Sequence, residues 1–100
     1  MTITELQKQI MALAKKKGWG TKPDAVSFGD KIALLHEEVS EALKAYRKGN
    51  MSDKGGVAEE LADLVIRAVH LAGIYSVDLD EEIRNKLNTN EERDWDWDKL

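Results

Sequence analysis

The segment from Val57 to Tyr75 has the clearest pattern of apolar and polar positions in the chain. At about 100° per residue it would form a helix of about five turns whose polar side chains share an arc of about 100°. The members of this polar stripe are Glu59, Glu60, Asp63, Arg67 and His70. The other positions are apolar or small. We therefore predict a helix that is buried almost all round, with its acids confined to one line of contact with another polar surface.

Three further helices are predicted from apolar spacing and from signals at the helix ends. Ser/Thr/Asp residues followed three positions later by an acid or amide start each helix, and glycines after basic residues end the first two. The segments are Thr4-x-x-Gln7 to Gly18, Ser27-x-x-Asp30 to Gly49, and Asp78-x-x-Glu81 onward with Leu79, Ile83 and Leu87. No strand pattern appears between them.

The connections and the C-terminal tail are polar. A loop from 18 to 26 holds Trp19 and the single proline, and a glycine-containing turn spans 50–56. The tail from 88 to 100 places Trp95 and Trp97 between aspartates. We therefore predict one all-α domain over residues 1–100, built as a four-helix bundle-like fold.

The charge balance narrows the classes of partner. The net charge of −4 argues against a nucleic-acid surface, because phosphate binding needs a basic face. The absence of cysteine excludes disulfides and thiol catalysis, and the N-terminal residues do not resemble a signal peptide. The apolar segment 57–75 holds five ionisable side chains, so no membrane span is expected. We expect a cytoplasmic protein.

Acidic side chains also gather on the second predicted helix, at Glu37, Glu38 and Glu41. Glu38 and Glu41 are three residues apart, as are Glu60 and Asp63, and this spacing puts both members of a pair on one helix face. Two buried helices that turn such pairs toward each other would repel unless a cation lies between them. We therefore predict a divalent-metal site between the second and third helices.

The ligand types favour a hard cation. Carboxylate oxygens select Mg²⁺ or Mn²⁺, whereas zinc would want histidine or cysteine. A di-iron bundle needs Glu-x-x-His pairs, which neither His36 nor His70 completes. Arg67 follows Asp63 by one turn, where it could bind a carboxylate or a phosphate. The alternative is that the acids form a solvated face with ordinary surface pairs such as Asp63–Arg67.

Two acidic motifs and the segment after the fourth helix resemble a known family. Their sequences are His36-Glu37-Glu38-Val39-Ser40-Glu41-Ala42-Leu43, Glu59-Glu60-Leu61-Ala62-Asp63 and Lys86-Leu87-Asn88-Thr89-Asn90-Glu91-Glu92-Arg93. They are similar to the E-E-x-x-E, E-x-x-D and K-x-x-x-N-x-x-R patterns of the MazG-like all-α nucleoside triphosphate pyrophosphohydrolases. The likeness covers nearly the whole chain.

The resemblance implies hydrolysis of (deoxy)nucleoside triphosphates to the monophosphate and pyrophosphate, as a means of clearing or adjusting nucleotide pools. It also implies that Mg²⁺, or Mn²⁺ in its place, is held by Glu38, Glu41, Glu60 and Asp63. Glu37 and Glu38 would be the catalytic carboxylates, with Glu37 serving as a second-metal ligand or as a base that orients water.

The substrate-binding residues predicted are Trp19, Arg67, Lys86, Asn90 and Arg93. The resemblance assigns the last three to the phosphates, from the same subunit or a neighbouring one. Trp19 in its loop is a natural stacking surface for a base, or alternatively a hydrophobic plug between helix ends.

An apolar helix is hard to cover within an 11.3 kDa chain. We therefore expect a homodimer or homotetramer whose interface buries Leu64, Val65, Leu71 or their neighbours, with Trp95 and Trp97 packed on the partner subunit. Two functional alternatives stay open. One is a non-catalytic helical dimer or regulatory module that keeps the fold, and the other is a pyrophosphohydrolase of a phosphoribosyl nucleotide.

Overall fold

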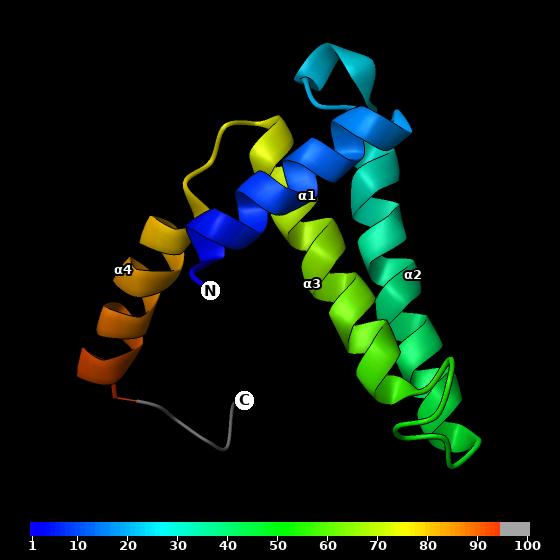
Figure 1. The fold of residues 1–100 in the computed structure, drawn as a ribbon. Coiled ribbons are helices and arrows are strands. Elements are labelled where there is room, and N and C mark those ends of the chain that lie inside the picture. The colour runs from blue at the N-terminus through cyan, green and yellow to red at the C-terminus, as the bar shows by residue number, and fades with distance from the viewer. Residues whose placement is uncertain (95–100) are drawn as a thin grey trace.

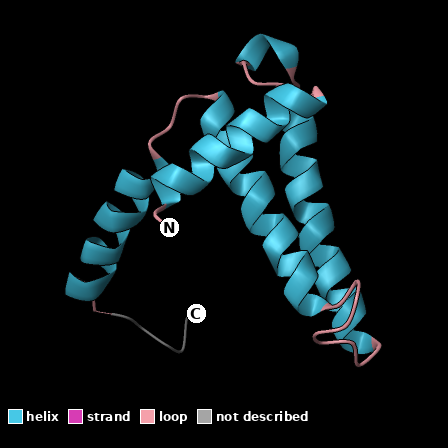
Figure 2. Ribbon diagram, in the orientation of Figure 1, coloured by secondary structure: helices cyan, strands magenta, loops and turns pink. Residues whose placement is uncertain are grey.

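The protein is described from a computed structural model, and the structure describes residues 1–94. The described chain consists of four α-helices and one 3₁₀ turn: α1 (Ile3–Lys17), η1 (Pro23–Ala25), α2 (Phe28–Arg47), α3 (Val57–Ile74) and α4 (Leu79–Glu92). No strand occurs within residues 1–94, so the prediction of an all-α fold is confirmed (Figure 2). The predictions for Trp95 and Trp97 lie outside the described residues.

Side-chain caps define two of the helix starts as predicted. The Ser27 hydroxyl accepts a hydrogen bond from the Asp30 backbone N–H at the start of α2. The Asp78 carboxylate accepts one from the Glu81 N–H at the start of α4. Each bond satisfies a backbone donor that the first helical turn leaves without an internal partner.

The start of α1 differs from the prediction, because its cap is Thr2 rather than Thr4. The Thr2 hydroxyl accepts from the Glu5 N–H at 3.0 Å and donates to the Glu5 carboxylate at 3.3 Å. A second sequence of the capping-box type, Thr2-x-x-Glu5, therefore lies two residues earlier, and its charged glutamate also suits the positive end of the helix dipole. Thr4 instead contacts α4, where its backbone N–H donates to the Asp80 carboxylate at 3.2 Å.

The helices form a close pair with two further helices at one end (Figure 1). α2 and α3 lie side by side and antiparallel, joined by a turn in which the Asn50 side chain accepts from the Asp53 N–H and donates to the Lys54 carbonyl. α1 crosses α3 near its C-terminal end, where a Cβ on Gly73 would overlap the Met11 side chain. α4 packs against α1 and the end of α3 and diverges from the α2–α3 pair.

The core lies at the crossing of α1 and α3. Its buried apolar side chains are Ile10 and Ala14 of α1 and Val69, Leu71 and Ile74 of α3, with Ala45 of α2 buried separately. The C-terminal half of α3 is therefore covered within one chain. Within residues 1–94, no helix is long and apolar enough to cross a membrane.

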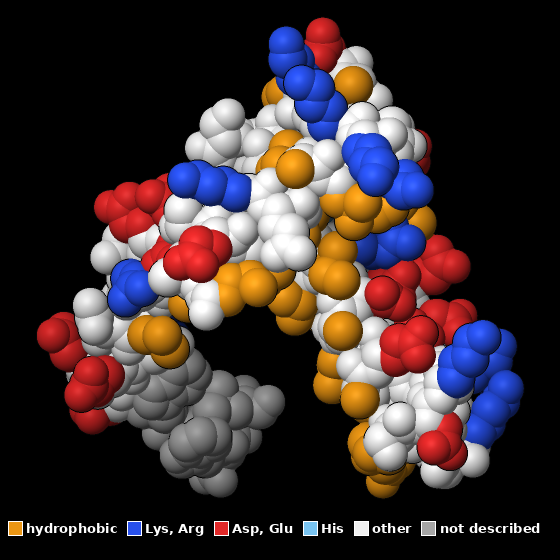
Figure 3. Space-filling model, in the orientation of Figure 1, with side chains coloured by type: hydrophobic (Ala, Val, Ile, Leu, Met, Phe, Trp, Pro, Cys, Tyr) orange, Lys and Arg blue, Asp and Glu red, His pale blue; other side chains and the backbone are white. Residues whose placement is uncertain are grey.

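Within one chain only the C-terminal half of α3 is buried, so burial of its N-terminal half stays a prediction that depends on a partner subunit. About half of the Leu61 and Val65 side chains is exposed, because α1 crosses only the other half of the helix. Leu71 is already buried inside the chain, which removes it from the predicted subunit interface. We call Val39, Leu43, Tyr46, Leu61 and Val65, all of them exposed, the open apolar face. Figure 3 shows hydrophobic side chains along the hollow between α4 and the α2–α3 pair.

Candidate metal centre and adjoining pocket

Three carboxylates from α2 and α3 meet at the contact between these helices. Oxygen atoms of Glu38, Glu60 and Asp63 all lie within 4.8 Å of one another. Glu60 and Asp63 share one face of α3 because they are three residues apart, and Glu38 faces them from α2. Glu38 is only 8% exposed, which is unusual for a glutamate. We call these residues the carboxylate cluster.

Arg67 supplies a positive charge to the cluster. Its Nε donates to Oε1 of Glu38 at 2.9 Å. Counted over side-chain atoms alone, Arg67 is 40% exposed and Glu38 is 11% exposed. A buried carboxylate requires such a partner, because burial alone disfavours its charged form. The structure thus shows the carboxylate-binding role that the sequence allowed for Arg67.

The cluster holds more negative charge than Arg67 can balance. The pKa of Glu60 is raised above its ordinary value, first by a hydrogen bond with Glu38 and then by desolvation. The charges of Glu38, Asp63 and Glu41 raise it further. Neighbouring carboxylates favour a shared proton when no other cation is present, so this shift is the expected signature of a site that prefers an additional positive charge.

A pocket of about 400 Å³ opens beside the cluster. Its lining residues are Trp19, Lys31, Glu38, Asp63, Ile66, Arg67 and His70. The lining combines charged side chains with two aromatic rings and the apolar side chain of Ile66. Such a mixture of an apolar wall and a few convergent charged groups is typical of small-molecule sites.

Three contacts hold the loop that carries Trp19. The buried His70 ring places Nε2 2.8 Å from the Gly20 carbonyl oxygen. The rings of Trp19 and His70 meet edge to face with centroids 6.2 Å apart. The Lys31 ammonium donates to the Trp19 carbonyl at 3.3 Å. Trp19 is therefore fixed at the pocket while its side chain stays exposed enough to contact a ligand.

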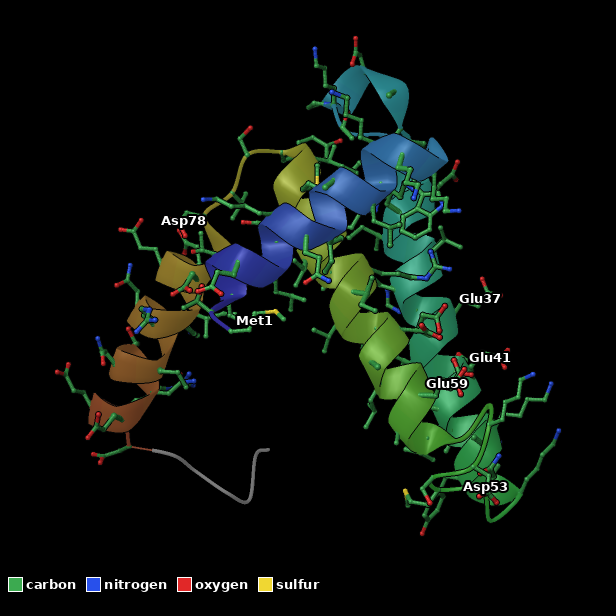
Figure 4. The ribbon with its side chains drawn as sticks, viewed as in Figure 1. Met1, Glu37, Glu41, Asp53, Glu59 and Asp78 are labelled. Carbon is green, nitrogen blue, oxygen red and sulfur yellow. The ribbon has the colours of Figure 1, made fainter. Side chains whose placement is uncertain are left out.

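Glu37, Glu41 and Glu59 lie outside the carboxylate cluster. Glu37 and Glu41 are exposed, and Glu37 projects outward from α2 (Figure 4). Glu41 is nevertheless close enough for its charge to raise the pKa of Glu60. Glu59 accepts a hydrogen bond from the Gly55 N–H at 3.0 Å and so belongs to the turn before α3.

The predicted phosphate-binding residues of the fourth helix do not line the pocket. Lys86 and Asn90 lie on α4, and Arg93 caps its C-terminal end. α4 continues beyond Leu87, where the sequence predicted a polar tail, so these residues share one helical segment. Because α4 diverges from the α2–α3 pair, one chain does not bring them to the carboxylate cluster (Figure 1).

Sequence reasoning missed Lys31 as a residue of the pocket, and it left His70 open as either a partner of the metal ligands or an interface residue. A signal for both was present. Lys31 precedes Glu38 by seven residues and His70 follows Asp63 by seven, which is about two helical turns in each case. Each therefore lies on the same helix face as its acid. His36, which the sequence left outside the metal site, is exposed.

The fold and the carboxylate cluster together define an all-helical protein with a candidate divalent-metal site beside a pocket. Among curated proteins, the chain is similar to one named dATP/dGTP diphosphohydrolase, from Cyanophage S-2L. The two are 35% identical over 94 residues, which is 94% of this chain and 78% of the relative. The chain therefore belongs to the same protein family as that diphosphohydrolase. No protein-family model matches the chain, and no solved structure matches it.

Proposed function

We propose that this protein hydrolyses (deoxy)nucleoside triphosphates to the monophosphate and pyrophosphate, in the manner of the MazG-like family. The observation that carries the proposal is the carboxylate cluster opening into a pocket lined in part by aromatic rings. The relative's name specifies dATP and dGTP. These two nucleotides are accordingly the first substrates to test.

The donor set fits a hard divalent cation. Two helices supply carboxylate oxygens that lie within 4.8 Å of one another, from Glu38, Glu60 and Asp63. The raised pKa of Glu60 indicates that its charged form is not fully balanced by nearby cations. Glu41, one turn along α2 from Glu38, is the proposed fourth ligand. We propose Mg²⁺, with Mn²⁺ as a substitute. When bound there, such an ion neutralises phosphate oxygens and makes a coordinated water more acidic.

The other pocket residues are proposed to bind the base and the phosphates of the substrate. Trp19 presents its indole ring to the base, and the Lys31 and Arg67 cations face the phosphates. We propose that Glu38, which lines the pocket together with Asp63, orients an attacking water. Glu37 projects away from this space, so a role for it would need a second metal or phosphate on the outer side of α2.

A second copy of the chain would complete this arrangement. The radius of gyration is 15.6 Å, against about 13 Å for a compact chain of this length. The open apolar face leaves large side chains in water, which favours a homodimer or homotetramer. Association would also give the Lys86, Asn90 and Arg93 segment a route to a neighbouring pocket. Sedimentation should show a species larger than 11.3 kDa at micromolar concentration, and Val65→Asp should dissociate it.

The activity is tested with a nucleotide panel and Mg²⁺, with products separated by anion-exchange chromatography. We expect dATP or dGTP to give the monophosphate and pyrophosphate in equal amounts, and Asp63→Asn to give neither. Products of diphosphate plus orthophosphate, or no turnover of any triphosphate, would contradict the proposal. Turnover of a phosphoribosyl nucleotide alone would favour that alternative, and no turnover at all would favour a non-catalytic helical module.

A further inference from the structure

The Arg67–Glu38 ion pair joins two residues for which the proposed function requires different ligands. Glu38 is needed for the divalent cation, and Arg67 is needed for the phosphates. In the structure the two residues bind each other instead, since Nε of Arg67 lies 2.9 Å from Oε1 of Glu38. While this bond stands, Oε1 of Glu38 and the Nε–H of Arg67 are each withheld from the ligand that the proposed function assigns to them.

The metal-free cluster accounts for the pair. Glu38 is 8% exposed and lies beside Glu60 and Asp63, so its charge needs a cation that water cannot replace. Arg67 lies one turn beyond Asp63 on α3 and reaches Glu38 across the helix contact. A divalent ion in the cluster would supply more positive charge than the guanidinium and would repel it.

We infer that Arg67 is the resident counter-ion of the metal-free cluster, that it leaves Glu38 when a divalent cation takes over this carboxylate, and that it then binds the triphosphate. The inference rests on the proposed function. Its consequence is an order of binding, in which the cation must enter before the nucleotide finds Arg67 available.

The surroundings of Arg67 allow such a movement. Its side chain is 40% exposed and lines the same pocket as Lys31 and Trp19. Because Glu38 and Arg67 both line this pocket, the guanidinium has only to part from Oε1 of Glu38 to meet a ligand there. The planar fork of donors that it presents there matches phosphate oxygens better than a lysine would.

A different role for Arg67 makes the opposite prediction. If Arg67 stays on Glu38 and orients it as a ligand, removing the guanidinium will weaken cation binding. If Arg67 competes with the cation, removing it will strengthen cation binding. The sign of one measured change therefore separates the two roles.

The first experiment measures Mg²⁺ affinity of the free protein by calorimetry and by the Mg²⁺-dependent rise in melting temperature. We expect Arg67→Gln to bind Mg²⁺ about tenfold more tightly than the unaltered chain, because a competing charge has gone. Unchanged or weaker binding overturns the inference. Should Arg67→Gln fail to fold without metal, the ¹⁵N experiment on the unaltered chain tests the same opening, with the Arg67 signal assigned by its loss in Arg67→Lys.

Two matched controls isolate the ion pair. Arg84→Gln removes an arginine whose Nε also binds a carboxylate, that of Asp80, and should leave Mg²⁺ affinity unchanged. Lys31→Gln removes a cation from the same pocket that is bonded to the Trp19 carbonyl instead. It should strengthen Mg²⁺ binding less than threefold. An effect of Lys31→Gln as large as that of Arg67→Gln would show general electrostatics and overturn the specific role of the pair.

The second experiment observes the pair directly, through the ¹⁵N-labelled Nε–H signals of the arginines. The Arg67 signal, assigned by its loss in Arg67→Gln, should shift when Mg²⁺ is added, as its bond to Glu38 opens. The Arg84 signal should stay in place. An Arg67 signal that keeps its position at saturating Mg²⁺ overturns the inference.

The third experiment tests the second half of the movement with inorganic tripolyphosphate as the probe. With saturating Mg²⁺, Arg67→Gln should bind the probe about tenfold more weakly than the unaltered chain. In EDTA the two should bind it equally, because Arg67 is then held by Glu38. An equal loss in both conditions would make Arg67 a permanent phosphate ligand. Since none of these experiments measures turnover, a failure of the inference is distinguishable from a failure of the proposed function.

Discussion

α3 and α4 each carry an arginine whose Nε contacts a carboxylate, but the two pairs have different surroundings. Arg84 binds Asp80 within α4, and the same carboxylate accepts from the Thr4 N–H. The pKa of Asp80 is lowered, mainly by the hydrogen bond from Arg84 and then by Thr4. Arg67 binds Glu38 between α3 and α2, and beside this pair the pKa of Glu60 is raised.

The comparison shows how a structural acid differs from a candidate site acid. Donors surround Asp80, so its charged form is stabilised and nothing further is needed. At the carboxylate cluster the acids outnumber the cations, and the neighbouring carboxylates raise the pKa of Glu60. A surplus of charge that folding alone does not require is a physical indication of a ligand of opposite sign.

The largest expected effect comes from removing one acid of the cluster. Asp63→Asn should lower kcat/KM for the best nucleotide at least 1,000-fold, about 4 kcal/mol, because the amide cannot replace a charged metal ligand. Steady-state kinetics with Mg²⁺ measure this. Asp80→Asn is the matched control and should stay within about threefold of the unaltered chain. An Asp63→Asn enzyme with nearly full activity would place the reaction elsewhere.

A smaller effect is expected from the end of α4. Arg93→Ala should cost about 1–3 kcal/mol in kcat/KM, the usual range for a hydrogen bond to a charged group, and should leave Mg²⁺-induced stabilisation intact. Arg84→Ala on the same helix is the control. Mixing Arg93→Ala with Asp63→Asn tests the origin of the residue, because activity that recovers on mixing requires Arg93 to act in a neighbouring subunit.

Within the cluster, two amide substitutions should change stability in opposite directions when no metal is present. Glu38→Gln removes the charged partner of Arg67, and with Arg67 partly exposed the cost should be about 1 kcal/mol. Glu60→Gln relieves repulsion and should raise the melting temperature. Thermal unfolding in EDTA compares them. If both variants melt below the unaltered chain, the acids of the cluster do not conflict.

The smallest effect is a difference in pH dependence between the two regions. Glu60 has a pKa above its ordinary 4.5, so its protonation stabilises the metal-free fold below about pH 4.5, and this contribution is lost as pH rises through the folded-state pKa. Asp80 has a pKa below its ordinary 3.8, so its contribution is present above that value and is lost as pH falls through the folded-state pKa.

Melting temperatures across pH in EDTA measure both contributions. Glu60→Gln should flatten the decline of the melting temperature above pH 4.5, and Asp80→Asn should flatten the decline below pH 3.8. The two variants serve as controls for each other. A Glu60→Gln curve that runs parallel to that of the unaltered chain above pH 4.5 would show that this carboxyl does not titrate differently on folding.

Local signals carried most of what the sequence predicted correctly. Apolar spacing and caps such as Ser27 and Asp78 are encoded within a few residues, so the helices could be predicted. Glu60 and Asp63 could be placed on one face for the same reason, and their meeting with Glu38 followed from the cost of burying like charges. Thr2 was missed as a cap because two equivalent boxes overlap at the start of α1.

The relative placement of the helices could not be predicted from such local patterns. The direction of α4 depends on contacts such as Thr4 with Asp80, between residues 76 positions apart. The crossing of α1 over α3 depends on the absence of a side chain at Gly73. The exposed half of α3, with Val65, follows from that crossing and not from the apolar pattern of α3 itself.

The bond from the Thr4 N–H to Asp80 also makes the two ends of the described chain depend on each other. The first turn of α1 forms part of the surface on which α4 packs. Removal of the N-terminal residues through Thr4 would therefore destabilise a helix that begins more than seventy positions later. Limited proteolysis should accordingly cleave α4 sooner in a chain that lacks its first four residues than in the unaltered chain.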